Sequence, residues 1–151
     1  MPKLTADNNR IMIIRLIDFD ANNLIIDDAL TVFSLVYETT LITPDRKASS
    51  APQLADGEIL IFDLNGLTPK HLTKLGFSSL RCFFRYMIDA HPMRIKQIHL
   101  INCSSLLDKL VMVLRPFMAA RTMKVMHFHL PNSTTLFDFV ARELLPVELG
   151  G

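Results

Sequence analysis

Four short apolar segments, each followed by a stretch long enough for a helix, constrain the fold of this chain more than any other feature. Ile11–Ile17 (IMIIRLI) and Glu58–Asp63 (EILIFD) are almost wholly apolar and rich in β-branched residues. This composition is typical of strands that are buried on both faces. Arg94–Asn102 and Lys124–His129 are the third and fourth predicted strands. Apolar strands joined by helical crossovers favour a mainly parallel sheet with helices packed on it.

The segments between the strands carry the start and stop signals of helices. Aspartates stand where the first helix should begin, and prolines or glycines stand where helices should end. The predicted helices run from Asp27 to before Pro44, from Pro69 to before Gly76, and over Phe77–Ala90, Ser105–Ala120 and Ser133–Arg142. Residues 44–57 are polar and rich in breakers, so they are predicted to form a loop.

The composition describes one unusually apolar domain. Of the 151 residues, 50% are hydrophobic and only 21% are charged, with a net charge of +1. More apolar residues than one core needs indicate a cavity, a partner interface or a membrane-facing patch. The alternative is a compact domain with a sticky surface.

The net charge argues against nucleic-acid binding by bulk electrostatics. Two cysteines without metal-ligand spacing indicate a reducing interior, and the longest early apolar run is too short to span a membrane.

Sequence motifs of catalysis and cofactor binding are missing. The chain has no GxGxxG, GxxxxGK[ST], GxSxG or HExxH motif. We therefore expect no enzyme activity, no cofactor and no metal. His99 is predicted to be a hydrogen-bonded core residue. A hydrolase that uses His99 with Asp63 and Ser104 stays an alternative hypothesis. If Arg15 in the first strand is buried, it needs a partner, which we expect to be Asp63 or Asp18.

The helix predicted over Ser105–Ala120 is apolar around more than half of its circumference. Two stripes at helical spacing lie side by side: Leu106, Leu110, Val113 and Phe117, and then Leu107, Val111, Leu114 and Met118. A surface helix needs one such stripe. The second stripe indicates either deep burial or a movable lid, and Pro116 supplies a position where a hinge or kink costs little.

Several segments, in this order and spacing, resemble successive blocks of the CRAL-TRIO lipid-binding domain family. They are LTADNNRIMIIRLIDFD, DGEILIFDLNGL with the following KHL, AHPMRIKQIHLIN, LRPFMAARTMKVMHFH and ELLPVELGG. The resemblance covers essentially the whole chain and is closest to the α-tocopherol transfer protein-like members. It implies a single domain over residues 1–151, without the N-terminal helical domain of the family.

The resemblance further implies a mixed, mainly parallel sheet that floors a hydrophobic pocket, covered by helices that include a mobile gate helix. The gate corresponds to Leu106–Ala120. The implied lipid-binding residues are Phe33, Val36, Tyr37, Thr40, Phe62, Phe83, Tyr86, Met87, Ile98, Leu107, Leu110, Val113 and Phe117. Those implied to bind an anionic headgroup are Arg94, Lys96 and Arg121. The chain departs from the family pattern at Glu58 and Pro69 in the pocket and at Val125 in the headgroup site.

The function implied by the resemblance is the binding of a small hydrophobic lipid, such as a tocopherol or a retinoid, and its transfer between membranes. We expect transient contact with anionic or phosphoinositide-containing membranes, no nucleic-acid partner, and a cytoplasmic, peripherally membrane-associated protein. The alternative hypothesis is a lipid-sensing or protein-interaction module that retains the fold without transporting lipid.

Overall fold

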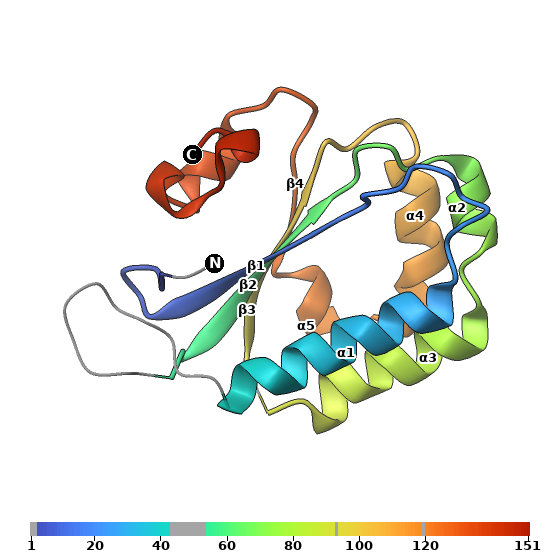
Figure 1. The fold of residues 1–151 in the computed structure, drawn as a ribbon, viewed down its shortest axis with the longest axis horizontal. Coiled ribbons are helices and arrows are strands. Elements are labelled where there is room, and N and C mark those ends of the chain that lie inside the picture. The colour runs from blue at the N-terminus through green and yellow to red at the C-terminus, as the bar shows by residue number, and fades with distance from the viewer. Residues whose placement is uncertain (1–2, 43–53, 93, 119) are drawn as a thin grey trace.

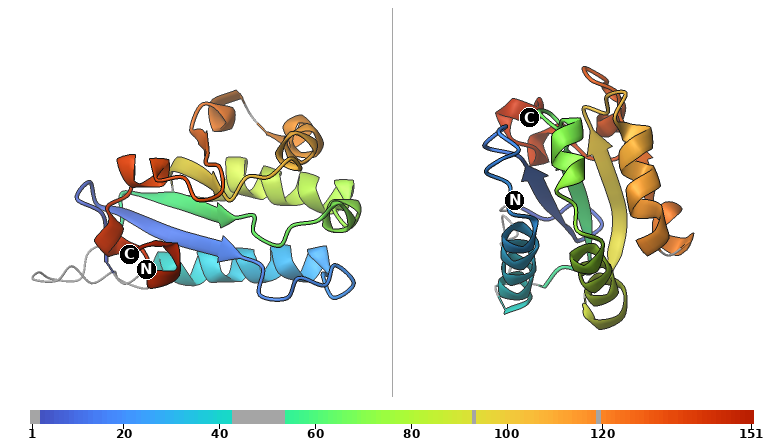
Figure 2. Two further views of the ribbon diagram at one scale, coloured as in Figure 1. Left: turned by 90° about the horizontal axis from the view of Figure 1, so that it is seen from above. Right: turned by 90° about the vertical axis from the view of Figure 1, so that its right-hand side faces the viewer.

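A four-stranded parallel sheet organises the chain. The computed structural model describes residues 3–42, 54–92, 94–118 and 120–151. The strands are β1 (Asn9–Arg15), β2 (Gly57–Asp63), β3 (Ile95–Ile101) and β4 (Met126–Phe128). They pair in the order β1-β2-β3-β4, and all three pairings are parallel. Figure 2 shows the first three strands side by side. The predicted parallel α/β architecture is therefore confirmed.

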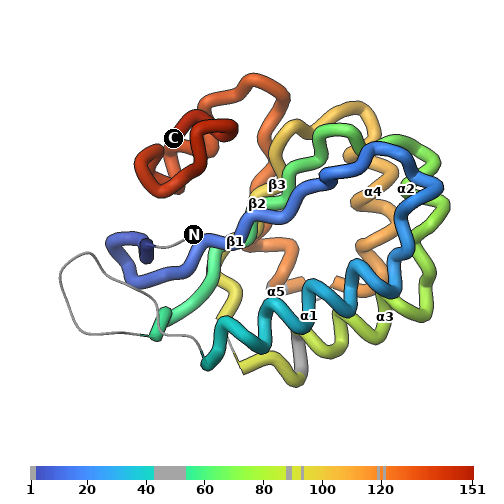
Figure 3. The backbone as a smooth tube through the Cα atoms, viewed as in Figure 1, coloured from blue at the N-terminus to red at the C-terminus, as the bar shows by residue number. Residues whose placement is uncertain are grey.

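The helices that connect the strands cover one face of the sheet. They are α1 (Ile26–Ile42), α2 (Pro69–Thr73), α3 (Phe77–Arg85), α4 (Leu107–Leu114) and α5 (Ala120–Met123). Because each crossover steps to the next strand in the same direction, right-handed connections return the helices to the same side. The C-terminal segment lies on the other face, so the sheet is the middle of three layers (Figures 1 and 3).

Alternation along the strands builds an apolar layer on each face of the sheet. On β2, Ile59 and Ile61 point to the C-terminal segment, whereas Leu60 and Phe62 point to the helices. The first layer, beneath the C-terminal segment, contains Ile11, Ile59, Ile61, Ile101, Leu136, Val140 and Leu145. The second layer is larger and separates the sheet from α1, α3 and α4. It has the position that the predicted pocket requires.

The prediction of one continuous helix over Ser105–Ala120 is wrong. The α-helix α4 ends at Leu114 and is followed by a 3₁₀ turn, η2 (Arg115–Phe117), after which Met118 has extended backbone angles. Pro116 explains the break, because proline lacks the N–H that continues the helical hydrogen-bond pattern and its ring crowds the preceding turn. Residue 119 lies outside the described residues. The candidate gate is thus a short α-helix with a tight turn at its end.

The prediction of a helix over Ser133–Arg142 is also wrong. The structure has the 3₁₀ turn η3 (Thr135–Asp138) in this range, and the 3₁₀ turns η4 (Arg142–Leu144) and η5 (Val147–Leu149) follow toward the C-terminus. Leu136, Val140 and Leu145 from this segment are buried against the sheet. In one continuous helix, Leu145 would point away from the face shared by Leu136 and Val140. Separate short turns allow all three side chains to pack against the sheet.

Other boundaries differ by a few residues. β1 begins and ends two residues before the predicted strand, and the helix predicted over Phe77–Ala90 changes at Tyr86 into a π-helical turn, η1 (Tyr86–Ala90). Of the loop predicted over residues 44–57, residues 44–53 lie outside the described part of the chain. A bulge between Glu58 and Ile59 shifts the pairing of β2 with β3.

Candidate functional site

The apolar layer between the sheet and the helices brings together most of the residues expected to bind lipid. Its buried members are Tyr37, Leu60, Met87, Ile98, Leu100, Cys103 and Leu110. Phe33, Phe62, Phe83, Tyr86 and Leu107 are partly buried and pack against them. The expected residues come from α1, β2, α3, η1, β3 and α4, whereas β1, α2 and β4 contribute other members of the layer, Met12, Leu72 and Met126.

Aromatic rings form the part of the layer between α1, β2 and α3. The centroid of the Phe33 ring lies 4.7 Å from that of Tyr37, 5.2 Å from that of Phe83 and 6.4 Å from that of Phe62. Phe33 and Tyr37 are four residues apart, which places both rings on one face of α1. Stacked and edge-to-face rings at these distances stabilise the packing of the helices on the sheet.

Four residues expected to bind lipid lie outside this cluster. Val36 is 45% exposed on α1. Thr40 uses its hydroxyl to donate to the carbonyl of Tyr37 at 2.7 Å. Val113 is half-buried on α4, and the Phe117 ring stacks on Phe84 at 6.3 Å. The apolar layer therefore contains nine of the thirteen residues expected to bind lipid.

An open groove of about 370 Å³ runs between α1 and α3. Its lining residues are Asp27, Leu30, Thr31, Ser34, Leu35, Ser79, Cys82, Phe83 and Tyr86. Phe83 and Tyr86 belong both to this groove and to the apolar layer. These two aromatic side chains therefore stand between the groove and the apolar layer.

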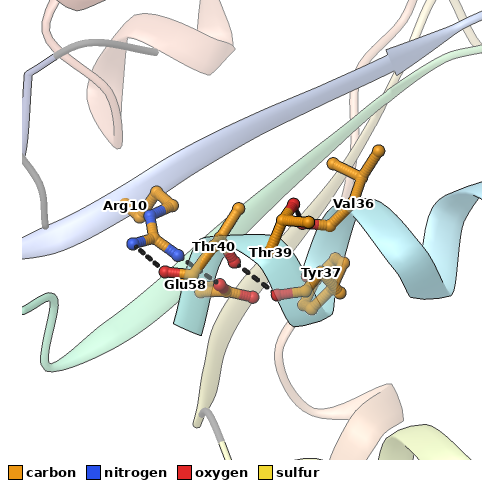
Figure 4. Close-up of polar contacts among 6 residues, drawn as sticks. All are labelled: Arg10, Val36, Tyr37, Thr39, Thr40 and Glu58. Carbon is orange, nitrogen blue, oxygen red and sulfur yellow. Dashed lines mark hydrogen bonds and ion pairs between the residues drawn. The ribbon is translucent and has the colours of Figure 1, made fainter. Parts of the chain in front are cut away.

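A buried ion pair at one end of the layer was missed by the sequence analysis. Arg10 of β1 and Glu58 of β2 are register partners, with Nη1 3.5 Å from Oε1 (Figure 4). Their side chains are 6% and 0% exposed. Arg10 also donates through Nη2 to the carbonyl of Thr40 at 2.8 Å, which ties the end of α1 to the sheet. A signal existed in the sequence, because each residue immediately precedes an apolar run and adjacent parallel strands align such runs.

Arg15 is not buried, so the condition under which it would need Asp63 or Asp18 as a partner is not met. It ends β1 and is exposed. Asp63 instead accepts hydrogen bonds from Asn102 Nδ2 at 2.7 Å and from the backbone N–H of Asn65 at 3.0 Å. Asp18 accepts from the backbone of Asp20 and from Asn23 in its own loop. These bonds lower the pKa of the Asp18 carboxyl.

Burial changes the acid–base chemistry at the Arg10–Glu58 end of the layer. Desolvation, followed by the charge of Glu58, raises the pKa of the fully buried Tyr37 far above its ordinary value. Desolvation also raises the pKa of Glu58, although Tyr37 and Arg10 act in the opposite direction. Tyr37 is therefore a permanent hydrogen-bond donor.

Histidines form a second polar network, on the sheet face beneath the C-terminal segment. His99 is fully buried, and its Nδ1 lies 3.0 Å from His129 Nε2 while its Nε2 lies 3.1 Å from Gln97 Oε1. Thr135 Oγ1 lies 2.7 Å from His129 Nδ1. The distances fit one directional chain in which Thr135 donates to His129, His129 to His99 and His99 to Gln97. His99 is thus a hydrogen-bonded core residue, as predicted.

The directional chain needs neutral imidazole rings at His99 and His129, each with one donor and one acceptor nitrogen. Desolvation and the nearby His129 and His127 lower the pKa of His99 to about 4. Desolvation also lowers the pKa of His129, against a smaller opposite effect of Asp138. Phe139 covers the group, with its ring centroid 4.3 Å from that of His127 and 5.2 Å from that of His99. Among the residues that the structure describes, no three His, Cys, Asp or Glu side chains are arranged to hold a metal ion.

The expected headgroup-binding residues begin at the amino end of β3. Arg94 is exposed, and its carbonyl accepts a hydrogen bond from the N–H of Glu58 at 2.9 Å. The stem of Lys96 lies across Gly57, where an added Cβ would be only 2.6 Å from Lys96 Cε. Arg121 belongs to α5, and its side chain lies outside what the structure describes. The described helices include none that is long and apolar enough to cross a bilayer.

The chain is an α/β protein with a parallel sheet and an apolar layer between that sheet and its connecting helices. The family of the CRAL/TRIO domain matches residues 1–151, and the chain belongs to this family. Clavesin-2 from Rattus norvegicus and from Homo sapiens are each 28% identical over 142 residues, which is 94% of this chain. The chain spans 41% of the length of these relatives.

Among solved structures, that of Sfh5 superposes with a TM-score of 0.55 at 9% identity. The match covers 90% of this chain and 48% of Sfh5. At this identity the likeness concerns the fold alone. The closer resemblance to α-tocopherol transfer protein-like members stays a prediction.

Proposed function

We propose that this chain binds a small hydrophobic lipid between its sheet and helices α1, α3 and α4, and transfers it between membranes without catalysing a reaction. The observation that carries the proposal is the apolar layer on the helical side of the sheet, to which all four strands and the helices α1, α2, α3 and α4 contribute. Family membership supports it. The ligand class we favour is a tocopherol- or retinoid-like lipid.

Burial of the hydrocarbon part of the lipid provides the affinity in this proposal. Each square ångström of apolar surface removed from water contributes roughly 25 cal/mol. The ligand would replace contacts that the side chains of the layer now make with one another. Leu110 of α4 is 8% exposed and packs in the layer, so outward movement of α4 would open it. The irregular turn at Pro116 supports α4 as the gate, because the backbone is not continuously helical there.

Basic residues at the amino end of β3 are proposed to dock the protein on anionic or phosphoinositide-containing membranes. Arg94 and Lys96 are the residues of this group whose side chains are described. Two or three cations attract an anionic surface with about 1 kcal/mol each. Such an attraction is weak and sensitive to salt, which suits a protein that delivers its ligand and leaves. On this basis we propose a cytoplasmic, peripherally membrane-associated protein.

Transfer of a labelled lipid between two vesicle populations tests the proposal. A donor population carrying a quenched fluorescent tocopherol should gain fluorescence faster when the protein is present, because transfer to acceptor vesicles relieves the quenching. Leu110→Asp should abolish this acceleration because it buries a charge in the layer, whereas Met112→Asp, at a residue 69% exposed on the same helix, should retain it. In parallel, native mass spectrometry of protein from cells should show a co-purifying lipid. A chain that carries no lipid and accelerates no transfer overturns the proposal.

The second candidate function is a protein-interaction module that retains the fold. It is favoured by exposed apolar side chains on α1 and at the residue just before it. They are between 45% and 82% exposed and comprise Ile25, Val32, Leu35, Val36 and Ile42. Val32, Leu35 and Val36 are spaced i, i+3 and i+4, so they lie on one face of α1. Lipid binding without any acceleration of transfer would support this candidate over the carrier.

A further inference from the structure

Among the residues that the structure describes, two buried polar atoms next to the apolar layer have no partner at hydrogen-bonding geometry. They are Oη of Tyr37 and Oε2 of Glu58, and both side chains are fully buried. The other carboxylate oxygen of Glu58 has Arg10 at 3.5 Å. Buried polar side-chain atoms nearly always have a partner, so each exception asks for an explanation. Figure 4 shows the two residues at the end of α1, close to the Arg10 side chain.

Both residues face the side on which the lipid is proposed to bind. Tyr37 is itself a buried member of the apolar layer, together with Leu60 and Ile98. Glu58 precedes Leu60 by two residues on β2, and side chains two apart in a strand share a face. The Tyr37 phenol and the Glu58 carboxylate also affect each other's pKa, through charge and as side-chain hydrogen-bonding groups, but Oη of Tyr37 and Oε2 of Glu58 do not reach the distance and angle of a formed hydrogen bond.

The two atoms offer complementary chemistry. The Tyr37 hydroxyl stays protonated and can donate, and the free oxygen of an ionised Glu58 can only accept. The positive charge of Arg10 favours the ionised form of Glu58. A ligand hydroxyl group is the simplest group that can hydrogen-bond to both side chains, because its oxygen accepts from Tyr37 while its hydrogen is donated to Glu58.

We propose that Tyr37 and Glu58 bind the hydroxyl group of the transported lipid, so that the chain selects a lipid alcohol or phenol. This inference rests on the proposed lipid-carrier function and narrows it. A fatty acid carboxylate meets the Glu58 charge and is disfavoured. An ether or a hydrocarbon of the same length leaves Glu58 without a donor and is bound more weakly.

Loading from vesicles tests this selectivity with flexible probes that differ in one group. Phosphatidylcholine vesicles carry equal amounts of octadecanol, octadecanoic acid and octadecyl methyl ether, and the lipids retained by the purified protein are quantified by mass spectrometry. We expect octadecanol to exceed each of the other two by about tenfold. Tyr37→Phe and Glu58→Gln should each remove most of that preference while C18 lipid is still loaded.

Controls separate this inference from the carrier function. Glu38→Gln makes the same acid-to-amide change at an exposed residue next to Tyr37, and it should keep the preference of the unmodified chain. Tyr37→Phe removes one oxygen from the layer, and circular dichroism checks that it folds. Equal loading of the three lipids, or Tyr37→Phe and Glu58→Gln variants that keep the full preference for the alcohol, overturns the inference and leaves the carrier function standing. If no C18 lipid and no native lipid is loaded at all, both proposals fail.

Discussion

Arg10 and Glu58 face each other across the first two strands, with Nη1 of the arginine 3.5 Å from Oε1 of the glutamate. Both side chains are almost completely removed from solvent. A buried ion pair costs desolvation energy, so it is seldom a source of stability by itself, but the loss of one partner leaves an uncompensated charge. The pair also connects the sheet to the end of α1 through the carbonyl of Thr40.

We predict that Arg10→Met destabilises the protein by about 3–5 kcal/mol, because Glu58 is then buried alone. The double variant Arg10→Met/Glu58→Leu should recover most of this loss, since it removes both charges and keeps apolar volume. Urea unfolding followed by circular dichroism measures the free energies. Arg15→Met on the same strand is the control, because Arg15 is exposed, and it should change stability by less than about 0.5 kcal/mol. Equal effects of the two arginine variants contradict the prediction.

We predict that the histidine network makes the folded protein less stable in acid. The pKa of His99 is about 4 in the folded chain and 6.5 when unperturbed, so the unfolded chain binds more protons between these values. Stability is therefore fully present above about pH 6.5, falls as the pH decreases toward 4, and loses up to about 3 kcal/mol from His99. The charged or titratable groups around it are His127 and His129, with Asp138 acting on His129.

Thermal unfolding between pH 4 and pH 7 measures this dependence. His99→Gln should flatten the curve, because the glutamine does not take up a proton. His71→Gln replaces a buried histidine outside the network and is the variant with which His99→Gln is compared. A His99→Gln curve as steep as that of the unmodified chain would falsify the assignment.

We predict that Leu110 anchors α4 to the sheet. Leu110→Ala should lower the free energy of unfolding by about 2–5 kcal/mol, because it leaves a cavity in the apolar layer. Met112→Ala on the same helix should have an effect below about 0.5 kcal/mol, since Met112 is 69% exposed. Chemical denaturation with urea compares the two. Similar losses at both positions would mean that α4 is not packed by its Leu110 face.

We predict that the double variant Arg94→Ala/Lys96→Ala weakens binding to vesicles that contain anionic lipid. Two cations at about 1 kcal/mol each correspond to roughly a 30-fold loss. The effect should disappear when the salt concentration is raised, because exposed charges are screened. Vesicle co-sedimentation measures the binding. Lys70→Ala/Lys74→Ala is the control, because it removes two cations in and next to α2, at the other end of the sheet. An equal loss for the control pair contradicts a headgroup site at β3.

The apolar layer was predictable from sequence and resemblance because its members occupy regular positions on strands and helices. Phe33 and Tyr37 share a helix face by their spacing, and Ile98 and Leu100 share a strand face. The helix over Ser105–Ala120 was predicted too long, since Pro116 and the residues around it read as helical by their apolar pattern alone. The helix predicted over Ser133–Arg142 was wrong because the apolar residues of the C-terminal segment follow no single period and fold into separate 3₁₀ turns.

The parallel α/β class, the order of the strands and the segments apolar enough to be buried follow from the amino-acid sequence alone. Local periodicity carries this information, because each strand or helix must present one face to a core. The folded chain was needed to show that Arg10 rather than Arg15 is buried, that His99 meets His129, and that Glu58 lies beside Tyr37. These pairs join residues 21 to 48 positions apart, and their contact depends on the register of parallel strands and on how α1 lies across them, which no local pattern specifies.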